Sequence, residues 1–331
     1  MMTNSFTKKS WLTFMVATLV ILTLCQLALA QTGWMPARVG AKGQDLNTVY
    51  FVDDKRGWVG GDGGYLARTE DGGQSWIHQT VGTTAAINDI YFRDKEAGFL
   101  LAGNTIFITR DEGTRWEVAR SFVPNEFDGA EVELYSVRFS SKKKGWVVGS
   151  VSKRDRVIDS ILVYTDDAGT TWRRQQAPSR TELIHIDFVN DKRGWIVGEG
   201  GTILYTEDAG DTWARQTSGT TATIYHIDFR NDKKGWGVGE RGTILRTTDG
   251  GENWSPVVTS AKVTILCVQF LNDDDGWAIG RAGTILKSED QGRTWVQQES
   301  TTKQNLYALN FNKWIGWVVG GDGRLLRYES N

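Results

Sequence analysis

The residues of this chain with the greatest potential for chemistry are acids that recur within a repeated motif. Six copies of a Ser/Thr-x-Asp-x-Gly-x-x-Trp motif place one aspartate each at Asp71, Asp111, Asp167, Asp208, Asp249 and Asp290. In a tight turn a carboxylate accepts backbone N–H bonds, glycine supplies a positive φ, and the tryptophan covers the hairpin. Because one chain does not need six copies of an active site, we interpret these acids as residues that build turns.

A second candidate site is formed by His185 and His226, which occupy the same place in two successive repeats and are followed by Asp187 and Asp228. Neighbouring strands could bring the four side chains together as a weak metal or acid/base site. Duplication of one core position explains the same pattern. The sequence contains no Ser-His-Asp elbow, phosphate-binding loop or zinc spacing of Cys and His. We therefore predict no catalytic residue, no metal and no cofactor.

The elements that position these residues are repeated seven times. A Gly-Trp pair, once Gly-Phe, marks each repeat and places its aromatic residue at Trp58, Phe99, Trp146, Trp195, Trp236, Trp277 and Trp317. Each repeat contains four short apolar or alternating runs separated by turns rich in Gly and Asp, which is typical of strands and hairpins. Four strands per repeat of about 41 residues is the sheet unit of a β-propeller. The fold is predicted to be all-β.

The two ends of the chain indicate how many blades there are. The last repeat reaches residue 331 without its fourth strand, whereas Trp34 stands 12 residues before Leu46. That interval is close to the 11 residues that separate Trp76 from Ile87 in a complete repeat. We therefore predict that the N-terminal strand supplies the missing outer strand. The result is a closed, seven-bladed propeller over residues 31–331, forming one domain and acting as a monomer.

Residues 1–30 have the features of an export signal. Lys8 and Lys9 precede an uncharged run over residues 11–30 that ends in Ala28-Leu29-Ala30, the small-residue pattern of a signal-peptide cleavage site. The same run is long enough to remain as a membrane anchor. Over the whole chain, 38 Lys and Arg residues nearly balance 40 Asp and Glu residues, so a nucleic-acid partner is not expected.

The repeat pattern resembles a known superfamily. Residues 235–254 read GWGVGERGTILRTTDGGENW, which is typical of the Asp-box, or bacterial neuraminidase repeat. Over about residues 33–331 the chain looks most like the photosystem II stability/assembly factor family of cyanobacteria and chloroplasts. That resemblance implies a non-enzymatic scaffold in the periplasm or thylakoid lumen, with membrane association left open. It also implies that the partner is the newly made reaction-centre protein D1, bound through an arginine-rich surface.

The alternative is a carbohydrate-active propeller, because sialidases and other glycosidases also contain Asp-boxes. Sialidases need an Arg-Ile-Pro motif near the start of the domain, and this chain has none. Other glycosidases need a pair of carboxylates at a set separation. No pair among the 40 acids stands apart from the repeat pattern.

Two insertions interrupt the repeat and indicate where a partner binds. Trp116 and Leu134 are 18 residues apart instead of 11, and Trp146 and Thr165 are 19 apart instead of 11. Both insertions are expected on the face opposite the Asp-containing turns, and insertions on one face often mark the binding face. Loops of that face carry basic residues: Lys153, Arg154, Arg156, Arg180, Arg241, Arg281 and Arg324.

Guanidinium groups suit carboxylate recognition, so these loops are expected to bind an acidic or C-terminal tail of a partner protein, such as a membrane-protein subunit. Acids stand on the same loops, at Asp62, Glu199, Glu240 and Asp322. A mixed, solvated surface is therefore the alternative interpretation of this face.

Overall fold

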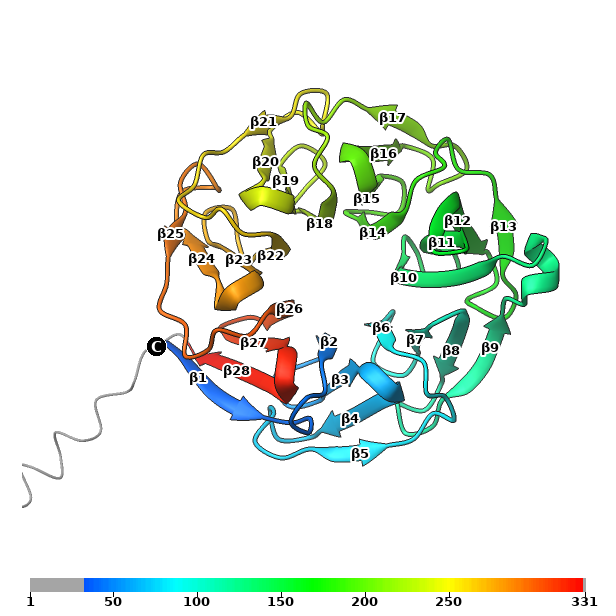
Figure 1. The fold of residues 1–331 in the computed structure, drawn as a ribbon, viewed down its shortest axis with the longest axis horizontal. Coiled ribbons are helices and arrows are strands. Elements are labelled where there is room, and N and C mark those ends of the chain that lie inside the picture. The colour runs from blue at the N-terminus through cyan, green and yellow to red at the C-terminus, as the bar shows by residue number, and fades with distance from the viewer. Residues whose placement is uncertain (1–32, 330–331) are drawn as a thin grey trace, which may run out of the picture.

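The computed structural model describes residues 33–329, which form seven four-stranded antiparallel sheets arranged as blades around a central axis (Figure 1). The predicted seven-bladed all-β propeller is confirmed. The predicted signal peptide over residues 1–30 lies outside the described residues. Among the described residues, no helix is long and apolar enough to cross a membrane.

Each blade runs outward from the axis in chain order. The strands of blades 1 to 3 are β2 (Leu46–Phe51), β3 (Gly57–Gly61), β4 (Tyr65–Thr69), β5 (Ile77–Gln79), β6 (Ile87–Phe92), β7 (Gly98–Ala102), β8 (Thr105–Thr109), β9 (Glu117–Ser121), β10 (Glu131–Phe139), β11 (Gly145–Lys153), β12 (Arg156–Thr165) and β13 (Arg173–Gln175). Those of blades 4 to 6 are β14 (Leu183–Phe188), β15 (Gly194–Gly198), β16 (Thr202–Thr206), β17 (Ala214–Gln216), β18 (Ile224–Phe229), β19 (Gly235–Gly239), β20 (Ile244–Thr247), β21 (Ser255–Pro256), β22 (Ile265–Phe270), β23 (Gly276–Gly280), β24 (Ile285–Ser288) and β25 (Val296–Gln297).

Short 3-10 turns connect the second and third strands of most blades. They are η2 (Asp62–Gly64), η4 (Glu199–Gly201), η5 (Glu240–Gly242), η6 (Arg281–Gly283) and η7 (Gly321–Gly323), while η3 (Pro124–Phe127) lies between blades 2 and 3. Blade 7 contains β26 (Leu306–Asn312), β27 (Ile315–Gly320) and β28 (Arg324–Glu329).

The ring closes through the two ends of the chain, as the sequence predicts. Strand β1 (Gly33–Arg38) pairs antiparallel with β28 and becomes the outer strand of blade 7 (Figure 1). Trp34 lies edge-on to Phe311, with ring centroids 5.8 Å apart. Trp254 lies edge-on to Phe229 at the same distance, so Trp34 takes the place of the outer tryptophan of a complete repeat.

Stacked aromatic rings join one blade to the next. The phenylalanine that ends an inner strand stacks on the Gly-Trp tryptophan, or Phe99, of the preceding blade at six of the seven interfaces. Phe270 and Trp236, for example, lie 3.4 Å apart, with their planes inclined by 11°. A Cβ on Gly235 would come within 2.5 Å of the Phe229 ring, so only glycine fits before this tryptophan. The Gly-Trp repeat therefore reflects the packing of the blade interfaces.

The repeated aspartates close the turn between the third and fourth strands; we call this turn an Asp-box. The Oδ1 atom of Asp167 accepts hydrogen bonds from the Thr165 hydroxyl and the Thr171 amide, both at 2.8 Å. Its Oδ2 atom accepts the Thr171 hydroxyl at 2.6 Å. The bonds from Thr171 lower the pKa of Asp167 to about 2. The ionised carboxylate is thus the form that holds the turn.

Replacing Asp167 by alanine should destabilise the propeller by about 1–3 kcal/mol, because two hydroxyls and one amide lose a charged acceptor. In the wild type this contribution is complete above pH 4 and is lost as the pH falls towards 2, since the folded-state pKa lies below the unfolded value. Urea unfolding of both proteins at pH 7 and pH 3 measures both effects.

The neighbouring Asp166 provides the control. Its carboxylate pairs only with the exposed Arg173, at 3.3 Å, so Asp166→Ala should change the unfolding free energy by less than about 1 kcal/mol. Equal losses from the two substitutions would show that the Asp-box carboxylate has no special role.

Candidate functional site

The propeller has two faces of different chemistry. The Asp-boxes and the turns between first and second strands share one face, where the Gly72 amide donates to the Lys55 carbonyl at 2.9 Å; we call it the Asp-box face. The opposite face, called the loop face, carries η2, η4 to η7 and the connections between blades. Both insertions lie on the loop face, as predicted. The Lys153 ammonium on one insertion donates to the Asp128 carbonyl on the other at 2.9 Å.

The insertions lengthen blade 3 beyond the rest of the ring. Strands β10, β11 and β12 contain 9, 9 and 10 residues, whereas β2 and β3 of blade 1 contain 6 and 5. The loop that carries η3 packs on this taller sheet, with buried Phe122 and partly buried Phe127 in the same apolar cluster as Val132. The Arg174 guanidinium lies over the Phe127 ring at 5.1 Å. Blade 3 therefore carries a supported projection on the loop face.

All seven basic residues selected from the sequence lie on the loop face or at its margin. Lys153, Arg154 and Arg156 are exposed at the end of the β11–β12 hairpin. The other four come from different blades, with Arg180 before blade 4, Arg241 in η5, Arg281 in η6 and half-buried Arg324 at the start of β28. The structure brings the first three together and spreads the others along an arc from blade 3 to blade 7.

Acids occupy the inner part of the same face. The Tyr135 hydroxyl donates to Glu182 Oε1 at 2.7 Å, and the Tyr307 hydroxyl donates to Asp45 Oδ2 at 2.8 Å. Glu133 is partly buried beside Asn88, and burial raises its pKa. These acids lie directly before or within the inner strands, so they are close to the axis. The turns η5 and η6, which carry Arg241 and Arg281, contact the inner strands β22 and β26 of the next blades, so acids and arginines share the inner part of this face.

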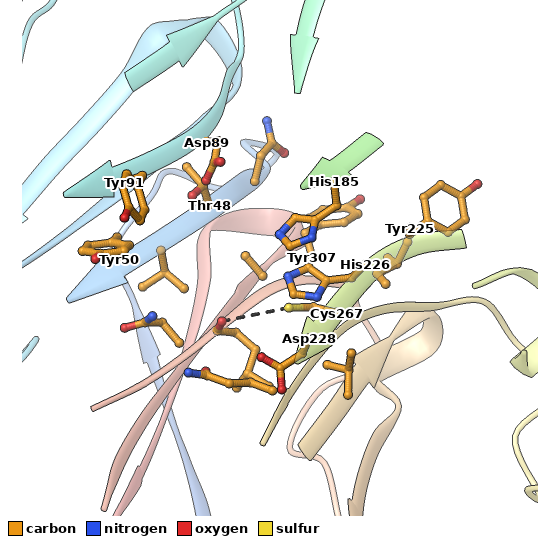
Figure 2. A pocket seen from close by; sticks show the side chains of 18 of the residues that line it. Thr48, Tyr50, Asp89, Tyr91, His185, Tyr225, His226, Asp228, Cys267 and Tyr307 are labelled. Atoms are coloured by element: carbon orange, nitrogen blue, oxygen red, sulfur yellow. Dashed lines mark hydrogen bonds between the residues drawn. The ribbon is translucent and has the colours of Figure 1, made fainter. Parts of the chain in front are cut away.

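A cavity of about 660 Å³ lies on the axis and is lined by the inner strands (Figure 2). His185 and His226 stack inside it with centroids 3.7 Å apart, so the inner strands do bring the two histidines together. The His185 Nε2 atom is 3.2 Å from Arg138 Nη2. Burial lowers the pKa of His185 well below its usual value and that of His226 to about 3. Both imidazoles are neutral at ordinary pH.

The two aspartates that follow these histidines join neighbouring blades. The Oδ2 atom of Asp187 accepts the Phe229 amide at 3.0 Å, and that of Asp228 accepts the Phe270 amide at 2.8 Å. Gln269 and Asn310 make the equivalent bonds in the next two blades. These bonds reach the backbone amides of Phe311 at 2.8 Å and Phe51 at 3.0 Å. The two aspartates thus belong to a ring of hydrogen bonds around the axis that links neighbouring inner strands, which we call the girdle. This shared role explains why the position is duplicated.

The girdle includes a buried ion pair that the sequence analysis missed. Arg138 Nη1 lies 2.7 Å from Asp89 Oδ2, and the same oxygen accepts the Val137 amide at 2.9 Å. The guanidinium also lies 5.3 Å from the Tyr91 ring centroid. The one available signal was an arginine in an inner strand, LYSVRF, where the other repeats have uncharged or acidic residues. Over residues 33–329, no group of three or more His, Cys, Asp or Glu side chains is arranged to hold a metal ion.

Comparison with known proteins connects this geometry to a family. The family model for the photosynthesis system II assembly factor YCF48 matches residues 74–180, 129–219, 216–264 and 256–329. The chloroplastic photosystem II stability/assembly factor HCF136 of Arabidopsis thaliana is 29% identical over 148 residues, covering 41% of this chain and 33% of that protein. The rice protein of the same name is 29% identical over 119 residues, covering 33% of this chain and 25% of its own length. The matches thus span a third or less of these relatives.

Solved structures share the fold. A structure described as YCF48 bound to D1 peptide aligns with a TM-score of 0.73 and 21% identity, covering 92% of this chain and 97% of that one. YCF48 from Cyanidioschyzon merolae aligns with a TM-score of 0.71 and 19% identity, covering 89% and 98%. A catalytically inactive virginiamycin B lyase from Staphylococcus aureus with quinupristin also aligns, with a TM-score of 0.73, 10% identity and coverage of 91% and 100%. At these identities the likeness shows the fold alone.

Asp228→Asn should remove part of the pH dependence of stability. Burial, reinforced by nearby Asp187, raises the pKa of Asp228 to about 8. Because the folded-state pKa lies above the unfolded value, the contribution of this carboxyl to stability is greatest below about pH 4 and declines as the pH rises towards 8. Asparagine keeps an oxygen acceptor for the Phe270 amide but cannot ionise, so the variant should be the more stable at pH 8, by on the order of 2 kcal/mol.

Urea unfolding at pH 5 and pH 8 measures the difference. Asp54→Asn on an exposed turn is the control and should leave the wild-type pH dependence unchanged. If Asp228→Asn shows the same decline between the two pH values as the wild type, burial of this carboxyl does not set the pH dependence.

Proposed function

Because this chain belongs to the family of the photosynthesis system II assembly factor YCF48, we propose that it is an exported scaffold that holds a segment of a membrane-protein subunit on its loop face. A similar structure is described as YCF48 bound to D1 peptide, so D1 is the partner we propose for a photosynthetic source. We propose a non-enzymatic, monomeric role. Its support is that both axial aspartates are engaged in hydrogen bonds between blades.

The observation that carries this proposal is the backbone conformation of two exposed arginines. Arg241 has φ +56° in η5, where the equivalent residues of η2 and η4 are Gly63 and Gly200. Arg154 has φ +53° at the tip of the β11–β12 hairpin. A side chain in this left-handed region costs about 1 kcal/mol or more relative to glycine. The guanidinium of Arg241 contacts only the adjacent Glu240 carboxylate, at 3.4 Å, which offsets little of that cost.

Ala282 of η6 and Asp322 of η7 hold the same conformation, so the exposed guanidinium distinguishes Arg241 within this strained position, and strained positions are typical of functional surfaces. Guanidinium groups bind carboxylates through two parallel hydrogen bonds, so the favoured ligand is an acidic segment or a chain terminus. The acids around the axis repel such a segment from the centre of the loop face. We therefore propose that the partner lies along the arc of turns from blade 3 to blade 7, over Arg154, Arg241 and Arg281.

The compartment we propose follows from the N-terminal run and from the relatives. The HCF136 proteins are described as chloroplastic. Residues 1–30 have the pattern of a cleaved signal peptide, with a retained anchor as the alternative. We propose the thylakoid lumen or the periplasm as the location, with membrane association if the run is retained.

Arg241→Gly should raise stability and weaken binding at the same time. Glycine relieves the backbone cost, so the unfolding free energy should rise by up to about 1 kcal/mol. Loss of the guanidinium should weaken binding of a fluorescently labelled D1 peptide several-fold, as measured by anisotropy. A change in binding without a gain in stability would mean that the fold itself requires this arginine.

Combined charge reversal should abolish binding. The variant carries Arg154→Glu, Arg241→Glu and Arg281→Glu. Its binding is compared with that of the wild type in a pull-down from the native membrane fraction and in the anisotropy assay. The matched control reverses three exposed arginines of the Asp-box face, at Arg110, Arg115 and Arg293. Equal binding by the variant and the wild type would overturn the proposed face. If the domain retains no protein but binds or cleaves glycans on an array, the carbohydrate-active alternative replaces this proposal.

A further inference from the structure

We infer that the outer edge of β12, over Arg156–Ile161, binds an extended segment of a partner protein as an added β-strand. The inference deepens the proposed function and rests on it for the class of partner. It identifies the mode of binding as strand addition and the ligand as a segment in which acidic and apolar residues alternate.

The edge exists because β12 is much longer than the strand that covers it. β12 contains ten residues, Arg156–Thr165, but β13 pairs only with Leu162–Tyr164. In blade 1, β5 pairs with three of the five residues of β4. In the described part of the chain, Arg156–Ile161 pairs with β11 on one side and with no strand on the other.

Along this edge, side-chain hydrogen bonds at Ser160 take the place of bonds to a neighbouring strand. The Ser160 amide donates to the Oδ1 atom of the adjacent Asp159 at 3.0 Å, and the Ser160 hydroxyl donates to the Thr181 carbonyl at 2.6 Å. A row of backbone groups without a neighbouring strand is a template for another chain. Main-chain hydrogen bonds supply the affinity in this mode, and alternate side chains supply the specificity.

The side chains around the edge define the ligand. Ile158 is 48% exposed, and it is one of the few large apolar side chains exposed in the described structure. Lys153, Arg154 and Arg156 are exposed at the hairpin end beside it, whereas Asp159 is paired with Arg174 at 2.8 Å. A ligand strand that places an apolar residue near Ile158 and acids near the cations complements both features.

The same charges disfavour a second copy of this chain as the occupant. Two identical edges pair antiparallel, which would set Arg156 of one copy opposite Ile161 of the other, so the cations would meet no acid. The irregularity in β11–β12 pairing at Val151/Ser152 restricts regular pairing to a short stretch. A short added strand is still adequate, because the ring's own outer strands β5, β13 and β17 contain only three residues each.

The test uses hydrogen exchange on the full domain with a short capped peptide of alternating glutamate and valine. The expected result is slower amide exchange in Arg156–Ile161 when the peptide is present. The control peptide has the same sequence, N-methylated at alternate residues, so it keeps the side chains but loses the donors on one edge. It should bind at least about tenfold more weakly. Ile158→Glu should weaken binding of the unmodified peptide, whereas Ile77→Glu, at another exposed isoleucine on β5, should not.

The outcomes separate this inference from the proposed function. If the N-methylated peptide binds as tightly as the unmodified one, or if protection appears only outside Arg156–Ile161, strand addition is overturned. Protection of the edge without peptide that grows with protein concentration assigns it to a second copy and also overturns the inference. If the D1 peptide fails to bind while the Glu-Val peptide protects the edge, the proposed partner is wrong but strand addition stands.

Discussion

The fit between neighbouring blades is the constraint on which the rest of this structure depends. At six of the seven interfaces a phenylalanine near the end of an inner strand stacks on an aromatic ring of the preceding blade and needs an empty space on its own blade. Trp236 supplies the surface for Phe270 at 3.4 Å, and Gly235 leaves the space for Phe229. Such pairs add about 0.5–1.5 kcal/mol each beyond the area they bury. Because the pattern must close on itself after seven blades, variation is confined to loops and to the lining of the axis.

The fold could be predicted because this constraint leaves a regular mark on the sequence. The interval from Trp34 to Leu46 was enough to place β1 in the last blade, since an outer tryptophan must precede the next inner strand at nearly constant distance. The roles of the side chains around the axis were harder to predict from the sequence than the fold. A register shift in each inner strand, such as that between Leu183 and His185, changes which residues reach the next blade. The sequence therefore placed His185 and His226 near the axis but could not show that the aspartates bond to backbone amides.

The loop face carries both acids and arginines, and some of the acids have a structural role. Acids at the inner rim accept hydrogen bonds from Tyr135 and Tyr307, so part of their charge serves to order the cavity mouth. The arginines of the same face have few charged partners among the described residues. Loop position in the sequence placed these arginines on one face, but it could not show which acids bond to Tyr135 and Tyr307, because those contacts depend on how neighbouring blades pack. The acidic ligand that we propose would therefore find its cations on the turns and on the taller blade 3.

Closure of the ring also explains how the loop face can hold residues that cost stability. A single left-handed arginine costs about 1 kcal/mol, which is small beside a fold in which every blade is held on both sides. The same support permits an incompletely covered strand in blade 3, because the hairpin is held by the η3 loop through Lys153 and by Arg174 at the edge of the sheet. A left-handed Arg154, an incompletely covered strand and the exposed guanidinium groups of Arg154 and Arg156 occur together at this projection. The first two are unfavourable for the isolated fold, and the ligand that we propose would use all three.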